Sequence, residues 1–312
     1  MSGVVTLGET MGLFRPEAIG SIAQVSEFQL GIGGAESNVA IGVARLGGSA
    51  TWIGRVGADS VGERVLRELR AEGVTTLGIV DAGARTGLMV KERRTASATS
   101  VAYYRSGSAG SRLDPADLDL DVIRAAGILH VTGITLAISA SAAAATMLAV
   151  DTAVGAGVPV SFDVNHRASL WGTDASPAYR AVAQRAAIVF AGEEEAAMLA
   201  PGATPADLAA AIADLGARQV VVKLGADGCH ALIDGDTHML PAIPVHPLDT
   251  VGAGDAFVAG YLAELLRGLP AAERLATAVR TGAFACLGPG DWESLPRRHE
   301  LGLLDGGDPV TR

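Results

Sequence analysis

Short runs of β-branched and other apolar residues alternate with longer stretches in which apolar positions recur at helical spacing. This alternation is typical of a parallel β-sheet that is covered by helices on both faces. Such sheets bind ligands beyond the carboxyl ends of their strands, near the point where the strand order reverses. The predicted strands are 4–7, 51–56, 128–132, 158–163, 187–190 and 219–223. The predicted helices lie near 35–46, 60–72, 139–155, 178–186 and 205–214.

Two regions depart from this alternation and predict a second, smaller sheet. Residues 12–30 have no helical period, and 86–105 contain two strand-like runs joined by a polar segment. A small inserted sheet can be a lid over a ligand or a hairpin without a binding role, and the pattern alone leaves both open. A further hairpin is predicted at 228–241.

The length of 312 residues fits one α/β domain. We place this domain at residues 1–300, with 12–30 and 86–105 inserted as lid segments, and expect a flexible tail at 301–312. Residues 131–150 are uncharged but rich in Ala, Ser, Thr and Gly. That composition predicts a buried strand followed by an Ala-rich helix rather than a membrane span.

Charge and cysteine content narrow the function classes. The 24 basic and 34 acidic residues give a net charge of −10, which argues against binding to nucleic acid or to an anionic membrane. Cys229 and Cys286 are too few for a disulfide framework, and the N-terminal segment resembles no signal peptide, so we expect a cytoplasmic protein. Lys91 and Lys223 are the only lysines, and no Gly-Lys dipeptide exists, which excludes a Walker A loop.

The segment from Asp249 to Phe257 carries the clearest chemical signal. Gly252, Ala253 and Gly254 lead into an apolar helix, and backbone N–H groups at a helix start bind anions. Asp255 lies in the first turn of that helix. A carboxylate there can cap the helix, or it can act as a general base beside a bound phosphoryl group, and both interpretations stay open at this point.

Four motifs in order along nearly the whole chain resemble the ribokinase-like (pfkB) carbohydrate kinases. They are Gly33-Gly34-Ala35-Glu36-Ser37-Asn38-Val39-Ala40, Gly54-Arg55-Val56-Gly57-Ala58-Asp59-Ser60-Val61-Gly62, Lys223-Leu224-Gly225-Ala226-Asp227-Gly228 and the Asp249–Phe257 segment. The resemblance implies the ribokinase-like three-layer α/β fold, with a mostly parallel central sheet and a small β-sheet lid. It also implies an ATP- and Mg²⁺-dependent sugar kinase, in which Asp255 is the base and the N–H groups of Gly252, Ala253 and Gly254 hold the transferring phosphoryl group.

Three further segments resemble 2-keto-3-deoxygluconate (KDG) kinases, whose substrate is a sugar acid. They are Tyr103–Ser111, Asp163–Arg167 and Gly290–Glu293. A planar guanidinium suits a carboxylate, so Arg105 and Arg167 are the expected readers of the acid group. The substrate-binding set that the resemblance implies is Gly34, Asn38, Tyr103, Arg105 and Arg167.

The resemblance also implies nucleotide and cation contacts. Glu195 would order Mg²⁺ through water, and Asp249 would border a site for a monovalent cation such as K⁺. The implied nucleotide-binding residues are Lys223, Gly225, Gly228, Gly252 and Gly254. The chain departs from the family pattern at Gly192, where many relatives have Asn, at Met89, where KDG kinases often have Tyr, and in 278–282, which lacks a common Asn.

Two rival functions remain from the sequence. One is a kinase for a neutral sugar such as ribose or fructose, which would need neither Arg105 nor Arg167 for a carboxylate. The other is a sugar-binding relative without turnover, which Gly192 and Val279 favour and the intact Gly-Ala-Gly-Asp run opposes. In every case the expected partners are a sugar or sugar acid and ATP. An exposed lid edge also predicts pairing with a second chain, and hence a homodimer.

Overall fold

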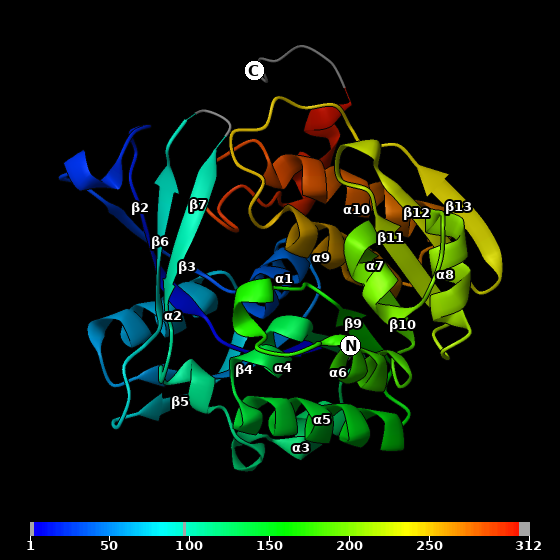
Figure 1. Cartoon of the computed structure of the whole chain (residues 1–312), viewed down its shortest axis with the longest axis horizontal. Coiled ribbons are helices and arrows are strands. Elements are labelled where there is room, and N and C mark those ends of the chain that lie inside the picture. Colours follow the sequence, from blue (N-terminus) through cyan, green and yellow to red (C-terminus); the bar gives the residue numbers. More distant parts are fainter. Residues whose placement is uncertain (1–2, 96–97, 306–312) are drawn as a thin grey trace.

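The computed structural model describes residues 3–95 and 98–305, which form a large and a small β-sheet with surrounding helices (Figure 1). The strands of the large sheet are β1 (Val4–Leu7), β4 (Ala50–Gly57), β5 (Thr75–Asp81), β8 (Ile128–Thr132), β9 (Val160–Asp163), β10 (Ile188–Gly192), β11 (Gln219–Lys223), β12 (Cys229–Ile233) and β13 (Asp236–Leu240). Their order is β13-β12-β11-β10-β9-β8-β1-β4-β5. All neighbours from β11 to β5 pair in parallel, and β12 and β13 add an antiparallel edge.

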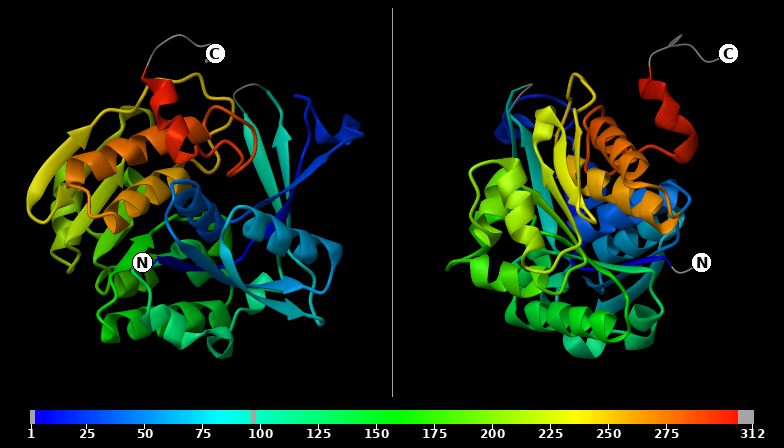
Figure 2. Two further views of the ribbon diagram at one scale, coloured as in Figure 1. Left: turned by 180° about the vertical axis from the view of Figure 1, so that it is seen from behind. Right: turned by 90° about the vertical axis from the view of Figure 1, so that its right-hand side faces the viewer.

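Helices cover both faces of this sheet, as the two further views in Figure 2 show. On one face lie α1 (Ala35–Arg45), α2 (Ser60–Ala71), α9 (Ala253–Leu266) and α10 (Ala271–Ala285). On the other lie α3 (Leu120–Arg124), α4 (Gly133–Ile138), α5 (Ala140–Gly155), α6 (Ser176–Ala183), α7 (Glu193–Leu199) and α8 (Pro205–Ala213). Short 3-10 turns are η1 (Ile22–Gln24), η2 (Gly110–Arg112), η3 (Pro115–Asp117), η4 (Ala168–Leu170), η5 (Gly225–Asp227) and η6 (Arg298–Leu304).

The alternation of buried residues along β11 explains the two helical layers. Val221 belongs to the core beneath α9 and α10, whereas Val220 and Val222 belong to the core on the opposite face. Successive side chains of a strand point to opposite faces, so an all-apolar strand needs a cover on each side. The predicted three-layer α/β class is confirmed.

The small sheet contains β2 (Met11–Arg15), β3 (Gln29–Gly33), β6 (Leu88–Arg93) and β7 (Thr99–Tyr104), in the order β3-β2-β6-β7. It stands apart from the large sheet, on the side opposite α8 and β13 (Figure 1). The separate sheet predicted from 12–30 and 86–105 is therefore confirmed, and we refer to it as the lid sheet. The mostly exposed β7 forms one of its edges, and dimerisation through such an edge stays a prediction.

Some elements differ from the predicted ones. The strand β5 was not predicted, because Thr75, Thr76 and Gly78 interrupt its apolar pattern and it lies at the sheet edge. The segment 131–150 contains the end of β8, then α4 and most of α5, and Ser139 caps α5 by accepting from the Ala142 N–H at 3.0 Å. The region expected as a tail begins within η6, and residues 306–312 lie outside the described residues.

Across the described ranges, no helix has both the length and the apolar character that crossing a membrane requires.

Candidate active site

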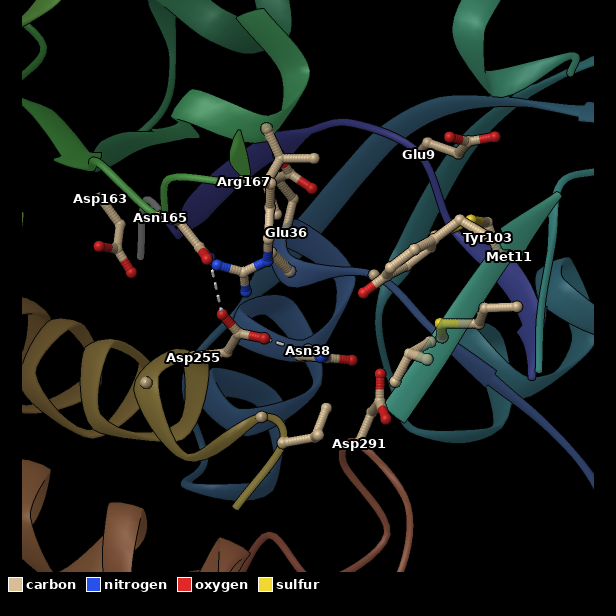
Figure 3. A pocket seen from close by; sticks show the side chains of 18 of the residues that line it. Glu9, Met11, Glu36, Asn38, Tyr103, Asp163, Asn165, Arg167, Asp255 and Asp291 are labelled. Carbon is tan, nitrogen blue, oxygen red and sulfur yellow. Dashed lines mark hydrogen bonds between the residues drawn. The ribbon is translucent and has the colours of Figure 1, made fainter. Parts of the chain in front are cut away.

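The strand order places a crevice above the middle of the large sheet. From β1 the chain builds outward in one direction through β4 and β5, and in the other through β8 to β11. A crevice therefore opens beyond the carboxyl ends of β1 and β8, where open α/β sheets bind ligands. A cavity of about 300 Å³ lies there, between this edge, the lid sheet and the start of α9. We call it the lid cavity, and Figure 3 shows side chains that line it.

The start of α9 is built as an anion site. Gly252 precedes the helix with a left-handed φ of 81°, and a Cβ on it would lie 2.0 Å from the Asp291 carbonyl oxygen, so only glycine fits. The Ala253 N–H donates to the Thr250 carbonyl at 3.3 Å. Among the described residues, no acceptor takes the N–H of Gly252 or Gly254. Two N–H groups at a helix start are thus available to an anion.

The Asp255 carboxylate faces the lid cavity and accepts two amide hydrogen bonds (Figure 3). Asn38 Nδ2 donates to Oδ2 at 2.8 Å, and Asn165 Nδ2 donates to Oδ1 at 3.3 Å. These donors belong to distant segments, and no side-chain cap bond closes α9, so the capping interpretation finds no support. The geometry leaves this carboxylate free to accept a proton from a bound ligand.

Burial raises the pKa of Asp255 to about 7, and the nearby charge of Asp163 acts in the same direction. The Asn38 hydrogen bond and the charges of Arg167 and Lys223 lower this pKa, without cancelling the effect of burial. A general base works best when its pKa lies near the working pH. Asp255 therefore combines the position and the proton affinity of a base at neutral pH.

Most other charges around the lid cavity are already paired. Arg105 Nη2 lies 2.7 Å from Glu9 Oε2, and the Glu9 side chain is only 1% exposed. Lys223 Nζ bonds to both oxygens of Asp163, at 2.8 and 2.9 Å. Burial lowers the pKa of Lys223, but the charges of Asp163 and its acidic neighbours outweigh burial and raise it overall. The positive and negative charges within each pair, Arg105–Glu9 and Lys223–Asp163, offset one another. Neither pair therefore adds a net charge to the cavity.

Arg167 differs from these paired cations. It is exposed at the mouth of the cavity, and its Nη1 donates to the His166 carbonyl at 2.9 Å. In the described ranges it forms no ion pair with a carboxylate. Figure 3 shows its guanidinium turned toward the carboxylate of Asp255, with Tyr103 reaching in from the lid sheet. Arg167 is thus the guanidinium that remains available to an anionic ligand.

The remaining predicted substrate residues also border the lid cavity. Tyr103 is 44% exposed and lies beneath the Arg105 guanidinium, whose central carbon is 5.9 Å from the ring centroid. Gly34 approaches the backbone so closely that a Cβ would lie 2.3 Å from the Glu9 carbonyl oxygen. Met11 and Met89 provide an apolar wall. The structure therefore brings Gly34, Asn38, Tyr103, Arg105 and Arg167 together around one cavity.

A second cavity, of about 600 Å³, adjoins the lid cavity at the start of α9. It has an apolar wall that includes Phe257 and Val279, and Gly225 and Gly228 border it. A Cβ on Gly228, at φ 97°, would lie 2.0 Å from the Leu240 carbonyl oxygen. The two cavities share Lys223, Thr250 and Gly254. A flat apolar ligand group and a small polar ligand could therefore meet at the anion site.

The residues predicted to bind cations have other partners. Glu195 accepts the N–H of Gly192 at 2.6 Å and of His166 at 2.8 Å, so it fixes the loop that carries Arg167. Asp249 Oδ2 lies 2.7 Å from Lys91 Nζ. The described residues contain no group of three or more His, Cys, Asp or Glu side chains suited to a metal ion. Magnesium does not require such a group, because it keeps waters and binds substrate phosphates.

Sequence reasoning missed several residues of the site. Asn165, which has a φ of 40°, and Asp163 lie inside a quoted motif but received no role. Glu9 follows β1 without any recognisable motif. Lys91 could have been noticed, because it is one of only two lysines and the other lies in the site.

The comparisons with known proteins agree with this geometry. The model of the pfkB family carbohydrate kinases matches residues 1–298. The 2-dehydro-3-deoxygluconokinase of Bacillus subtilis (strain 168) is 36% identical over 95% of this chain and 93% of that protein. Fructokinase-1 of Oryza sativa subsp. japonica is 33% identical over 96% of each chain.

Solved structures of sugar kinases are also similar to this chain. A putative ribokinase II from E. coli in complex with ATP and Mg²⁺ has a TM-score of 0.91 and 26% identity, covering 98% of this chain and 99% of that one. A fructokinase double mutant from Vibrio cholerae O395, with bound fructose, ADP and potassium ion, has a TM-score of 0.85 and 27% identity. It covers 97% of this chain and 99% of that one.

Proposed function

Because this chain belongs to the pfkB family of carbohydrate kinases, we propose that it transfers the γ-phosphoryl group of ATP to the terminal primary hydroxyl of a sugar acid, 2-keto-3-deoxygluconate. The observation that carries the proposal is Arg167, a cation without a described acid partner at the lid cavity that holds Asp255. A carboxylate on the sugar would supply that partner. The B. subtilis relative, named for this substrate, supports the choice.

The lid cavity and the α9 start define the chemical roles. Asp255 accepts the proton of the primary hydroxyl, and the hydroxyl oxygen forms a bond to the γ-phosphorus while the bond to the ADP oxygen breaks. The N–H groups of Gly252 and Gly254 stabilise the charge on the transferring group, as oriented donors do for developing anions. Removing a group of this kind costs ~2.7–4 kcal/mol of transition-state stabilisation.

ATP fits the second cavity. Its adenine would lie against the apolar wall, and Gly225 and Gly228 would allow the nucleotide to approach the backbone. Lys223, at the junction of the two cavities, would contact the phosphates. Magnesium would supply charge neutralisation between the phosphates when bound, with Glu195 as its predicted outer ligand through water.

A neutral-sugar kinase is the second candidate, and one observation favours it. Arg105 is already neutralised by Glu9, so the lid side of the cavity offers hydrogen bonds for hydroxyl groups rather than a free positive charge. The fructokinase relatives fit this alternative. The two candidates differ in whether the Arg167 guanidinium meets a substrate carboxylate.

Steady-state kinetics with a sugar panel test the proposal. ATP consumption is measured with KDG, gluconate, fructose and ribose at one ionic strength, and Asp255→Asn serves as the control for background hydrolysis. We expect KDG to have the highest kcat/KM, at least about tenfold above fructose. A higher kcat/KM for fructose or ribose would reject the sugar acid and favour the neutral-sugar candidate.

A further inference from the structure

Lys91 is a buried cation that the phosphoryl-transfer scheme does not use. It lies on β6 of the lid sheet, and its side chain is 1% exposed. Its ammonium contacts Asp249 Oδ2 at 2.7 Å, Asp291 Oδ1 at 3.2 Å and the Gly290 carbonyl at 3.4 Å. Both carboxylates are themselves almost fully buried. A lysine so deeply buried needs paired acids, and here the strand brings it to two at once.

Both acids contact the turn that forms the anion site of α9. Asp249 Oδ1 accepts the Val251 N–H at 3.1 Å, so its carboxylate fixes the turn that leads into Gly252. The Asp291 carbonyl oxygen fills the place where a Cβ on Gly252 would lie, at 2.0 Å. A cation that binds both acids therefore also fixes the backbone between them.

The charge balance shows why a cation is needed at this place. Without Lys91, two buried carboxylates would stand beside the N–H groups that receive the phosphoryl group, and their field would oppose a phosphate. Burial raises the pKa of Asp291, and the charges of Glu293 and Asp249 act in the same direction, whereas Lys91 lowers it. The Lys91 ammonium places a positive charge beside both acids and so weakens the negative field that they would exert on a phosphate at the anion site.

The surroundings of Asp249 do not fit the potassium ion that family resemblance suggests there. The V. cholerae fructokinase contains a potassium ion. In this chain the ammonium of Lys91 already occupies Asp249 Oδ2, and Asp249 Oδ1 is used by the Val251 N–H. A second monovalent cation on the same carboxylate would stand a few ångströms from the ammonium and be repelled by it.

We propose that Lys91 is a built-in monovalent cation, which positions the anion site for phosphoryl transfer and makes the enzyme independent of potassium. The inference rests on the proposed kinase reaction, although it does not depend on which sugar is phosphorylated. In the proposed reaction Lys91 contacts neither the sugar nor ATP. It is therefore a positioning residue that acts through Asp249, Asp291 and the turn at Gly252.

The first test compares the wild-type protein in KCl and in choline chloride at equal ionic strength. ADP affinity by titration calorimetry and melting temperature are measured beside kcat and KM for ATP. We expect each quantity to agree within about twofold, or within about 1 °C for the melting temperature, in the two salts. An activation by potassium of tenfold or more, or a matching gain in ADP affinity, would overturn the proposal. The calorimetric and thermal measurements need no sugar, so they stay informative if KDG is not the substrate.

The second test removes the ammonium in two ways. Lys91→Ala leaves space next to Asp249, and we expect kcat/KM for ATP to fall about 10- to 100-fold in choline chloride and to recover several-fold in potassium or ammonium chloride. Lys91→Met fills the space without charge, and we expect a similar loss that neither salt repairs. Arg93→Met, two residues along the same strand, controls for lid perturbation and should show no salt dependence.

Two results with the Lys91 variants would contradict the proposal. Wild-type activity in Lys91→Met, or a folded Lys91→Ala protein that no small monovalent cation rescues, would contradict the role of Lys91. Folding is checked by melting temperature and circular dichroism. If Lys91→Ala does not fold, the double variant Lys91→Met/Asp249→Asn replaces it, because it removes one charge of each sign. It should fold and still show weakened ADP binding, and unweakened binding would overturn the proposal.

Discussion

Replacing Asn38 by Ala should move the acid limb of the pH–rate profile to higher pH. Asp255 accepts a proton only when it is ionised, and its pKa is about 7. Wild-type kcat/KM should therefore decline as the pH falls through about 7, with about a tenth of the plateau left at pH 6. The Asn38 amide donates to the carboxylate at 2.8 Å and favours the ionised form, so its loss favours the protonated form.

The expected shift follows from the strength of that hydrogen bond. A hydrogen bond to a charged group contributes ~1.5–3 kcal/mol, and one pH unit corresponds to ~1.4 kcal/mol. The limb should therefore move upward by about one to two pH units. Asn165 donates from 3.3 Å, so Asn165→Ala should give a smaller shift in the same direction.

The assay is kcat/KM for the best sugar substrate between about pH 5.5 and 9.5. A phosphate group of ATP also titrates near pH 6, but its ionisation is the same for every variant, so a difference between variants belongs to the protein. Asp255→Asn supplies the baseline, with a rate ~10²- to 10⁴-fold lower and no limb near pH 7. An identical limb in the wild type and Asn38→Ala, or more than a tenth of wild-type turnover in Asp255→Asn, would refute the general-base role.

Three further changes test separate parts of the site. Arg167→Ala should lower kcat/KM for the sugar acid by roughly 10- to 100-fold and lower kcat/KM for fructose much less. Equal losses on the two substrates would show that Arg167 does not bind a substrate carboxylate. Glu9→Gln should lower the free energy of unfolding, measured by urea denaturation, by ~3–5 kcal/mol, because it leaves the charge of Arg105 without its buried partner. A loss below about 1 kcal/mol would show that the ion pair is dispensable for stability. Gly252→Ala should reduce kcat by more than about tenfold with little change in the KM for sugar, because the φ of Gly252 is 81° and the added Cβ would meet the Asp291 carbonyl. A kcat near the wild-type value would show that the backbone at the anion site tolerates this displacement.

The sequence predicted the elements that repeat a strong apolar pattern. The strands β1, β8 and β11 begin and end at the predicted residues, because their buried runs are short and uninterrupted. The strand β5 escaped prediction because an edge strand buries less of its surface and tolerates Thr and Gly. The lid sheet was predicted from the absence of helical periodicity, but its place beside the crevice depends on tertiary contacts.

The site was predictable only where a residue lies inside a local motif. Asp255 and Arg167 were selected in this way, and both border the lid cavity. Asn38 was assigned to the substrate, which stays a prediction, and its amide also donates to Asp255 across 217 residues of sequence. The pair of Arg105 with Glu9 joins residues that are 96 positions apart. No local pattern encodes such contacts, because the fold alone brings the partners together.

A competition experiment tests the central claim most directly. The enzyme receives ATP, Mg²⁺ and equal concentrations of KDG and fructose, and the phosphorylated products are identified by mass spectrometry and by phosphorus–carbon couplings in NMR spectra. The proposed function predicts KDG phosphate as the main product, with the phosphate on the terminal primary carbon. Fructose phosphate as the main product, or a phosphate on any other carbon of KDG, would contradict it.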